Sequence, residues 1–293
     1  MTPVLLVPLI TPLGADGGID IPALAGLSHA ALAGGAAGIV LFGTLGEGQS
    51  FSLDERRAAL EGLLAVGIAP DQITLGIGTA AVPEAVALAR HGLALGVTRQ
   101  LLLPPFFFKG VSDEGVYRVT AETLDAVGDP ELRVLLYDIP PVTSVTYAPD
   151  VVARLQASHG AVIAGIKDSV PDWRHVETNL ERFPDLEFFV GNEIFLPRAL
   201  EMGGAGAISG LGNIAARQMA AIATGRADTG TFERMCALYH AIGRHPVIPT
   251  VKALTARQAG IPSLARPRAP LMPVDLGSMP EVVAALDALL GIG

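Results

Sequence analysis

The residue with the clearest chemical potential in this sequence is a lysine that ends a buried strand. The chain has three lysines against seventeen arginines, and only Lys167 closes an uninterrupted apolar run. Lys109 follows a loop and Lys252 opens a helix, so both can lie in water. An amine shielded from water is in part uncharged, and a neutral lysine is the nucleophile that forms Schiff bases with carbonyl substrates. The alternative is a structural ion pair with Asp168 or Glu47.

Two hydroxyl residues end other apolar runs. Tyr137 ends the run before that of Lys167, and a phenol beside a carbinolamine could carry protons to and from it. A tyrosine that only caps the core is the alternative. Thr44 lies in Gly43-Thr44-Leu45-Gly46-Glu47, where successive backbone N–H groups could hold a carboxylate, although an ordinary turn would look the same. Glu47 is interpreted as a buried charge partner or as a helix cap.

The elements that must position these residues alternate regularly between strands and helices. Apolar runs predict strands at Val4–Ile10, Gly38–Phe42, Ile73–Ile77, Gln100–Leu103, Val134–Tyr137, Val162–Ile166, Glu187–Val190 and Gly206–Ser209. Segments of helical period predict helices at Pro22–Ala33, Leu53–Val66, Val82–Leu95, Asp113–Val127, Ala148–Gln156, Trp173–Arg182 and Phe195–Met202. Uninterrupted runs are typical of parallel strands covered on both faces. Eight βα units predict an α/β fold, the (β/α)8 TIM barrel, whose active site lies at the carboxyl ends of the strands.

The chain after Asn213 differs, because the strands cease. Helices are predicted at Ala215–Thr224, Thr231–His245, Val251–Ala259 and Pro280–Leu290, the third introduced by Pro249. We therefore predict a barrel over residues 1–222 that carries the active site, with a helical region over residues 223–293 packed on it. A doubly wound sheet is the alternative, but the G-x-G-x-x-G that usually follows its first strand is missing.

Composition excludes several classes of protein. The net charge of −9 argues against nucleic acid as a partner, and 50% hydrophobic residues exclude disorder. The chain has a single cysteine, Cys236, and six histidines without ligand spacing, so we expect no metal site. A single cysteine cannot form an intramolecular disulfide, which favours the reducing cytoplasm. The stretch between Asp20 and Glu47 lacks charged residues, but a helix, a turn and a buried strand explain it better than a membrane span. The N-terminal residues lack a basic segment and a small-residue cleavage site, so we expect no signal peptide.

Three motifs at the strand ends resemble the dihydrodipicolinate synthase / N-acetylneuraminate lyase family of class I aldolases. They are Gly43-Thr44-Leu45-Gly46-Glu47, Tyr137-Asp138-Ile139-Pro140 and Gly165-Ile166-Lys167-Asp168-Ser169, with weaker support from Gly191 and Gly206-Ala207-Ile208-Ser209. The resemblance covers essentially the whole chain. It implies a (β/α)8 barrel with a C-terminal helical region, commonly assembled as a tetramer.

The resemblance also implies roles for single residues. Lys167 would form the imine with the 2-oxo group of pyruvate or a pyruvate-derived acid, Tyr137 would relay protons, and Thr44 would hydrogen-bond Tyr137. The backbone at Thr44 and Leu45 would hold the carboxylate, and the carbonyl of Ile208 would line the pocket. Gly191 is expected to lie at the substrate as well.

The chain departs from the family pattern at three places. Leu45 stands where the family usually has a second hydroxyl residue. Val142 stands where the lysine-pathway synthases have an arginine that binds the aldehyde's carboxylate. Phe106 and Phe107 replace the tyrosine that completes a relay across a subunit contact. Phe106, Phe107 and Val142 therefore predict a distal part of the substrate that is less anionic than aspartate semialdehyde, or even aromatic.

We expect a class I lyase that needs neither cofactor nor metal and that releases pyruvate by retro-aldol cleavage. Dehydration of a 2-oxo-deoxy-sugar acid and dihydrodipicolinate synthesis are the alternatives within the family. Outside it stand a binding protein that has lost turnover and a phosphate-dependent isomerase with Gly203–Gly206 and Gly210–Gly212 as its phosphate cradle. The expected partners are a small 2-oxo acid and further copies of the chain, as a tetramer or dimer, without nucleic acid or membrane.

Overall fold

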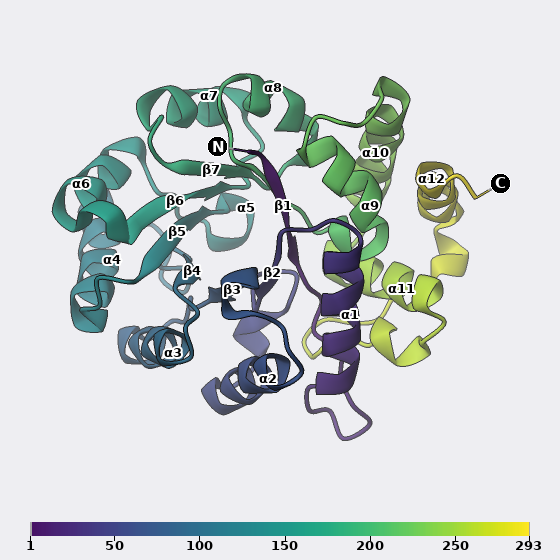
Figure 1. Ribbon diagram of the computed structural model, residues 1–293, viewed down its shortest axis with the longest axis horizontal. Coiled ribbons are helices and arrows are strands. Elements are labelled where there is room, and N and C mark those ends of the chain that lie inside the picture. Colours follow the sequence, from purple (N-terminus) through teal and green to yellow (C-terminus); the bar gives the residue numbers. More distant parts are fainter. Residues whose placement is uncertain (1, 293) are drawn as a thin grey trace. The chain divides into compact units, whose positions relative to one another are not determined.

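Eight parallel strands form a closed barrel in the structure, a computed structural model that describes residues 2–292 (Figure 1). The strands are β1 (Val4–Pro8), β2 (Gly38–Leu41), β3 (Ile73–Gly76), β4 (Arg99–Leu102), β5 (Arg133–Asp138), β6 (Ile163–Asp168), β7 (Glu187–Val190) and β8 (Gly206–Ile208). They follow one another in chain order around the barrel. The predicted TIM barrel is confirmed, and nearly every strand residue is buried, as uninterrupted apolar runs require.

The chain divides into two compact units, of which the first covers residues 69–206. It holds β3 to β7, which pair in parallel from each strand to the next. Its helices are α3 (Val82–Ala94), α4 (Asp113–Val127), α5 (Pro140–Thr143), α6 (Pro149–His159), α7 (Trp173–Arg182) and α8 (Leu196–Glu201), with short 3-10 turns at Pro70–Gln72, Gly160–Val162 and Glu193–Phe195.

Two helices of this unit, α4 and α7, begin at a side chain that accepts a hydrogen bond from a free backbone N–H group. Ser112 caps α4 by accepting a hydrogen bond from the N–H of Gly115, and Gly128 ends the helix in the left-handed region at φ 63°. Asp172 caps α7 in the same way as Ser112 caps α4. The four-residue helix α5 was not predicted, because one turn is too short to show a helical period.

The second unit joins residues 2–68 with residues 207–292. It holds β1, β2 and the last two residues of β8. Its helices are α1 (Ile21–Ala33), α2 (Leu53–Ala65), α9 (Gly212–Ala223), α10 (Thr229–Ile242), α11 (Val247–Ala259) and α12 (Pro280–Leu290), with 3-10 turns at Gly48–Ser50, Pro262–Ala265 and Leu276–Ser278. The predicted boundary after residue 222 falls at the end of α9, which packs against β1 and α1. The C-terminal helices therefore share a unit with the first two strands.

Two predictions about this unit can be compared with the structure. The charge-free stretch after Asp20 folds into α1 and β2 as expected, and no helix of the described residues is both long and apolar enough to cross a membrane. Helix α11 begins at Val247 and not at Val251. Pro249 lies in its first turn, where a missing N–H removes no helical hydrogen bond.

Candidate active site

The ends of β5 and β6 bring two of the predicted catalytic side chains together. Tyr137 and Lys167 are register partners on these adjacent strands. Lys167 Nζ lies 4.0 Å from the centroid of the Tyr137 ring, and the residues are 4% and 3% exposed, respectively. An amine nucleophile therefore has a phenol beside it in a place almost closed to water.

The alternative prediction for Lys167, a structural ion pair, finds no support within its unit. Asp168 follows Lys167 on the strand, so its side chain lies on the opposite face, where it contacts His175. Glu47, the other candidate carboxylate, is bound to Lys252 in the second unit. Among the described residues of its own unit, Lys167 has no carboxylate partner.

A buried charge cluster on the other face of these strands was missed by the sequence analysis. His175 Nε2 on α7 lies 3.2 Å from Oδ2 of Asp138 and 3.2 Å from Oδ2 of Asp168. Thr146 donates to Asp138 at 2.6 Å, and Asn179 Nδ2 lies 3.0 Å from His175 Nε2. The hydrogen bonds to Asp138 and Asp168 raise the pKa of His175 to about 10, so its ring is protonated at neutral pH, while burial raises the pKa of Asp168. The available signal was an aspartate directly after each of the two strand-end residues.

The free energy of unfolding is expected to fall as the pH rises from about 7 to about 10, because folded His175 holds a proton that the unfolded chain has released. A histidine whose pKa is raised by folding stabilises fully below its unfolded pKa of about 6.5, and the stabilisation is lost as the pH rises through the folded value. Allowing for partial exposure, we expect a loss of roughly 2–4 kcal/mol. Urea denaturation across this range measures it, with His175→Gln as the reference. The same pH dependence in both proteins would contradict the prediction.

Gly191 follows β7 and packs against the residues next to Lys167. Its N–H donates to the carbonyl oxygen of Asp168 at 2.6 Å. A Cβ at this position would lie 2.0 Å from Ser169 Oγ and 3.1 Å from the Asp168 carbonyl oxygen. Only glycine permits this approach, so the predicted substrate-binding position lies directly beside the strand end that carries Lys167.

In the second unit, the loop after β2 carries the residues predicted to bind the carboxylate. Leu45 is buried and Thr44 is half-buried. Glu47 adopts φ 54°, a left-handed conformation that is rare for a residue with a side chain. A Cβ on Gly48 would lie 2.2 Å from the carbonyl oxygen of Phe42. Contacts within the backbone of this loop therefore fix its conformation.

Ile208 ends β8 in the same unit as this loop. A Cβ built on Gly210 would lie 3.0 Å from Leu45 Cδ2, so the loop after β2 and the loop after β8 are in contact. The second unit therefore places Leu45 beside the segment that follows Ile208.

A buried ion pair holds the loop after β2, and it corrects the prediction for Lys252. Lys252 Nζ lies 2.5 Å from Glu47 Oε1 and donates to the carbonyl oxygen of Thr11 at 2.8 Å, while the N–H of Arg268 donates to Glu47 Oε2 at 2.6 Å. The Lys252 and Glu47 side chains are 0% and 1% exposed, and burial lowers the pKa of Lys252. The prediction that Lys252 can lie in water is wrong, because α11 begins earlier than predicted and Lys252 lies inside it. Glu47 is a buried charge partner.

Replacing Lys252 with methionine is expected to lower the free energy of unfolding by about 3–5 kcal/mol, because Glu47 is left buried without its cation. The double variant Glu47→Gln/Lys252→Met removes both charges and is expected to recover most of that loss. Urea denaturation of the three proteins gives the comparison. If the double variant is no more stable than Lys252→Met, the ammonium contributes through its shape and not its charge.

Two of the three residues predicted for the distal part of the substrate are exposed in the first unit. Phe107 is 70% and Val142 is 53% exposed. Lys109 joins their segments, because its ammonium donates to the carbonyl oxygen of Phe106 and, at 3.1 Å, to that of Thr143. Lys109 itself is exposed, as predicted.

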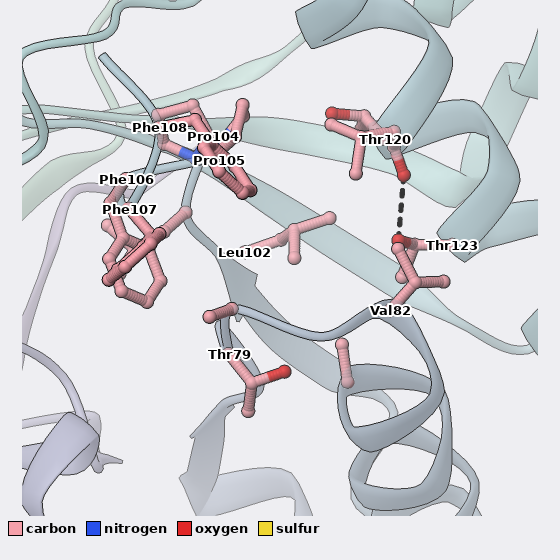
Figure 2. Close-up of a pocket in the computed structure, with 14 residues that line it drawn as sticks. Thr79, Val82, Leu102, Pro104, Pro105, Phe106, Phe107, Phe108, Thr120 and Thr123 are labelled. Atoms are coloured by element: carbon pink, nitrogen blue, oxygen red, sulfur yellow. Dashed lines mark hydrogen bonds between the residues drawn. The ribbon is translucent and has the colours of Figure 1, made fainter.

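Phe107 also lines a cavity of about 50 Å³ between the loop after β3, the loop after β4 and helix α4 (Figure 2). Phe106 and Phe107 lie on one side of it, and Thr120 and Thr123 lie on the other. Tyr137 is not among the lining residues, nor is Lys167. The cavity is therefore separate from the Tyr137–Lys167 pair.

Comparisons with known proteins identify the family to which this geometry belongs. The model of the dihydrodipicolinate synthetase family matches residues 2–289. The chain belongs to this family. An uncharacterized DapA-like lyase of Chloroflexus aurantiacus is 33% identical to it over 288 residues, which is 96% of this chain and 93% of that protein. A 4-hydroxy-tetrahydrodipicolinate synthase of Anaeromyxobacter sp. is 32% identical over 216 residues, 73% of this chain and 71% of the synthase.

Solved structures of the family share the fold. A dihydrodipicolinate synthase from Agrobacterium tumefaciens is 34% identical and superposes with a TM-score of 0.92 over 98% of this chain and 99% of its own. A 2-keto-3-deoxygluconate aldolase from Picrophilus torridus, at 24% identity, has the same fold with a TM-score of 0.81 over 94% and 99% of the two chains. The protein is an enzyme of the lyase type found in this family.

Among residues 2–292 the structure gathers no three His, Cys, Asp or Glu side chains that could hold a metal ion. His175 lies between two carboxylates, those of Asp138 and Asp168.

Proposed function

We propose that this enzyme forms an imine between Lys167 Nζ and C2 of a 2-oxo acid and releases pyruvate by retro-aldol cleavage. The observation that carries the proposal is the buried amine of Lys167 with the Tyr137 ring 4.0 Å away and no carboxylate paired with it among the described residues of its unit. An amine in such a place can attack a carbonyl carbon, whereas an ion-paired ammonium cannot.

The steps balance within the protein and the substrate. The amine adds to C2, and the carbinolamine oxygen leaves as water once it is protonated. The electron pair of the C3–C4 bond then forms the C2=C3 bond of an enamine and the C2=N π pair moves onto nitrogen, while the C4 hydroxyl gives up its proton and the aldehyde leaves. The resulting enamine gains a proton at C3, and water hydrolyses the imine to free pyruvate. Tyr137 is the group beside Lys167 that can give and take these protons.

Other substrate contacts remain proposals carried by the family resemblance. The Thr44 hydroxyl is assigned to Tyr137, the backbone of Thr44 and Leu45 to the substrate carboxylate, and the Ile208 carbonyl to the wall of the pocket. Gly191 is assigned to the same pocket, and its contact with Asp168 beside Lys167 supports that assignment.

The test of the imine uses pyruvate and borohydride. Reduction should attach a stable adduct to the peptide that contains Lys167, detected by mass spectrometry. A panel of 2-oxo acids followed by pyruvate release then distinguishes retro-aldol cleavage from dehydration of a 2-oxo-deoxy-sugar acid, which retains all carbon atoms. Labelling at another lysine, or at none with any acid of the panel, would refute the proposal.

The enzyme is expected to be a poor dihydrodipicolinate synthase, because Val142 offers no cation to the second carboxylate of the aldehyde substrate. The loss of one charge-assisted hydrogen bond costs about 1.5–3 kcal/mol, which corresponds to roughly ten- to a hundredfold in rate. Condensation of pyruvate with aspartate semialdehyde measures it, and Val142→Arg is expected to raise the rate. Fast condensation by the unchanged protein would contradict the prediction.

We further propose that the chain works as a homo-oligomer, a tetramer or a dimer, in the cytoplasm. The rings of Phe107 and Phe108, 70% and 71% exposed, stack edge to face with centroids 5.2 Å apart. Two exposed aromatic rings side by side favour burial against another protein surface. Sedimentation velocity across a concentration series measures the oligomeric state.

A further inference from the structure

Two buried carboxylates lie side by side behind the proposed site. Asp138 and Asp168 are register partners, each one residue after Tyr137 or Lys167, and each is 1% exposed. Because side chains alternate between the faces of a strand, the aspartates lie opposite to Tyr137 and Lys167. Like charges at paired positions of a sheet repel each other. The ends of β5 and β6 therefore need a cation at this point.

His175 on α7 supplies that cation. Its Nε2 lies 3.2 Å from Oδ2 of both aspartates, and its side chain is 19% exposed. Three titratable groups make up this cluster besides the ring itself: Asp138 on β5, Asp168 on β6, and Tyr147 before α6, whose pKa is raised by burial and to a smaller extent by Asp138. Among the described residues Asp138 Oδ1 has no hydrogen-bond partner. The buried charge of this carboxylate is therefore stabilised only through Oδ2, by His175 and Thr146.

The backbone of the same aspartates holds the segments beside Lys167. The carbonyl oxygen of Asp138 accepts from the N–H of Ser169 at 2.8 Å, and that of Asp168 accepts from the N–H of Gly191 at 2.6 Å. Asp168 Oδ1 accepts from the N–H of Val170 at 2.8 Å. A movement of either aspartate therefore moves the residues that flank the amine.

We propose that His175 is a positioning residue whose imidazolium clamps Asp138 to Asp168 and thereby keeps Tyr137 and Lys167 in register for the reaction. The inference rests on the proposed function, in which Lys167 forms the imine. His175 acts from the outer face of the strands and contacts the aspartates, not the reacting atoms. Its contribution is the spacing between the amine and the phenol, which sets the rate of proton transfer.

A charge-rescue cycle tests the clamp with three variants: His175→Gln, Asp138→Asn and the double variant of both. The rate at which pyruvate and borohydride label Lys167 is expected to fall about 10- to 100-fold in His175→Gln, with little change in pyruvate affinity. The double variant has one carboxylate and no repulsion, so its rate should return to within about fivefold of the unchanged protein. His159→Gln removes a histidine paired with Asp125 on another helix and should leave the rate unchanged.

The pH profile gives a readout that a packing role would not move. In His175→Gln the two carboxylates repel each other without a cation between them, so labelling should slow further as the pH rises, and this extra slope should vanish in the double variant. Losses that multiply in the double variant, or a His175→Gln rate within about threefold of the unchanged protein, would overturn the clamp.

Folding outcomes also decide the question. If His175→Gln fails to fold while the double variant folds, charge compensation by His175 is supported; if neither folds, the ring contributes by packing and the proposal is wrong. If the unchanged protein labels with no 2-oxo acid, the proposed function fails by itself. The clamp is then tested by the urea midpoints of the unchanged protein, His175→Gln, Asp138→Asn and the double variant. We expect the midpoint to recover in the double variant, and a midpoint that does not recover would refute the clamp.

Discussion

Lys167→Ala is expected to lose the borohydride-trapped pyruvate adduct completely and to lower turnover by about 10⁴-fold or more, equivalent to about 5.5 kcal/mol of activation free energy. The reason is that the covalent route disappears with the amine, and the first unit holds no second buried lysine to replace it, since Lys109 is exposed. Mass spectrometry of the reduced protein and a pyruvate-release assay measure the two effects.

Lys109→Ala is the matched control. This lysine also lies in the first unit, but its ammonium binds two backbone carbonyls at the surface. Its variant should form the adduct at the normal rate. An adduct that persists in Lys167→Ala and disappears in Lys109→Ala would move the imine to the other residue.

Tyr137→Phe is expected to lower kcat by about 10²–10⁴-fold, the usual contribution of a positioned acid–base group. The ring remains under Lys167 Nζ, so the cation–ring contact at 4.0 Å and the packing survive while the proton carrier is lost. Pyruvate affinity should change by less than about threefold, because the proposed carboxylate contacts lie on the backbone of another loop. Steady-state kinetics separates the two parameters.

Tyr147→Phe controls for the loss of a buried hydroxyl. Tyr147 is 1% exposed, and its hydroxyl lies 3.3 Å from Thr120 Oγ1. Its variant should lose about 0.5–1.5 kcal/mol of unfolding free energy and keep its kcat. Equal kcat values for Tyr137→Phe and the unchanged protein would make Tyr137 a packing residue.

The strands and the Tyr137–Lys167 pair could be predicted because both leave a recognisable pattern in short stretches of the sequence of a parallel barrel. Its strands are buried on both faces and appear as apolar runs, and the first polar residues after each run face the active end of the barrel. Lys167 is the only lysine that ends such a run, which is why its position alone indicated chemistry. The pairing of Tyr137 with Lys167 then followed from adjacent strands ending together.

The histidine clamp and the buried lysine could not be predicted in the same way. His175 was compared with other histidines, whereas its partners are aspartates on two strands. The sequence predicts that α11 begins at Val251, which places Lys252 at an exposed helix start. Its partner Glu47 lies 205 residues earlier in the chain. Both cases depend on contacts between elements distant in sequence, which local periodicity does not record.

The pair of Glu47 and Lys252 also constrains the order in which a growing chain can reach its final form. The loop after β2 is synthesised early, but its buried carboxylate has no cation until residue 252 has left the ribosome. A carboxylate without its partner is costly to bury, so this loop must stay hydrated while the intervening strands and helices are made. The second unit is therefore completed last, when the C-terminal helices return to the first strands, and a chain that stops short of α11 would lack a finished loop after β2.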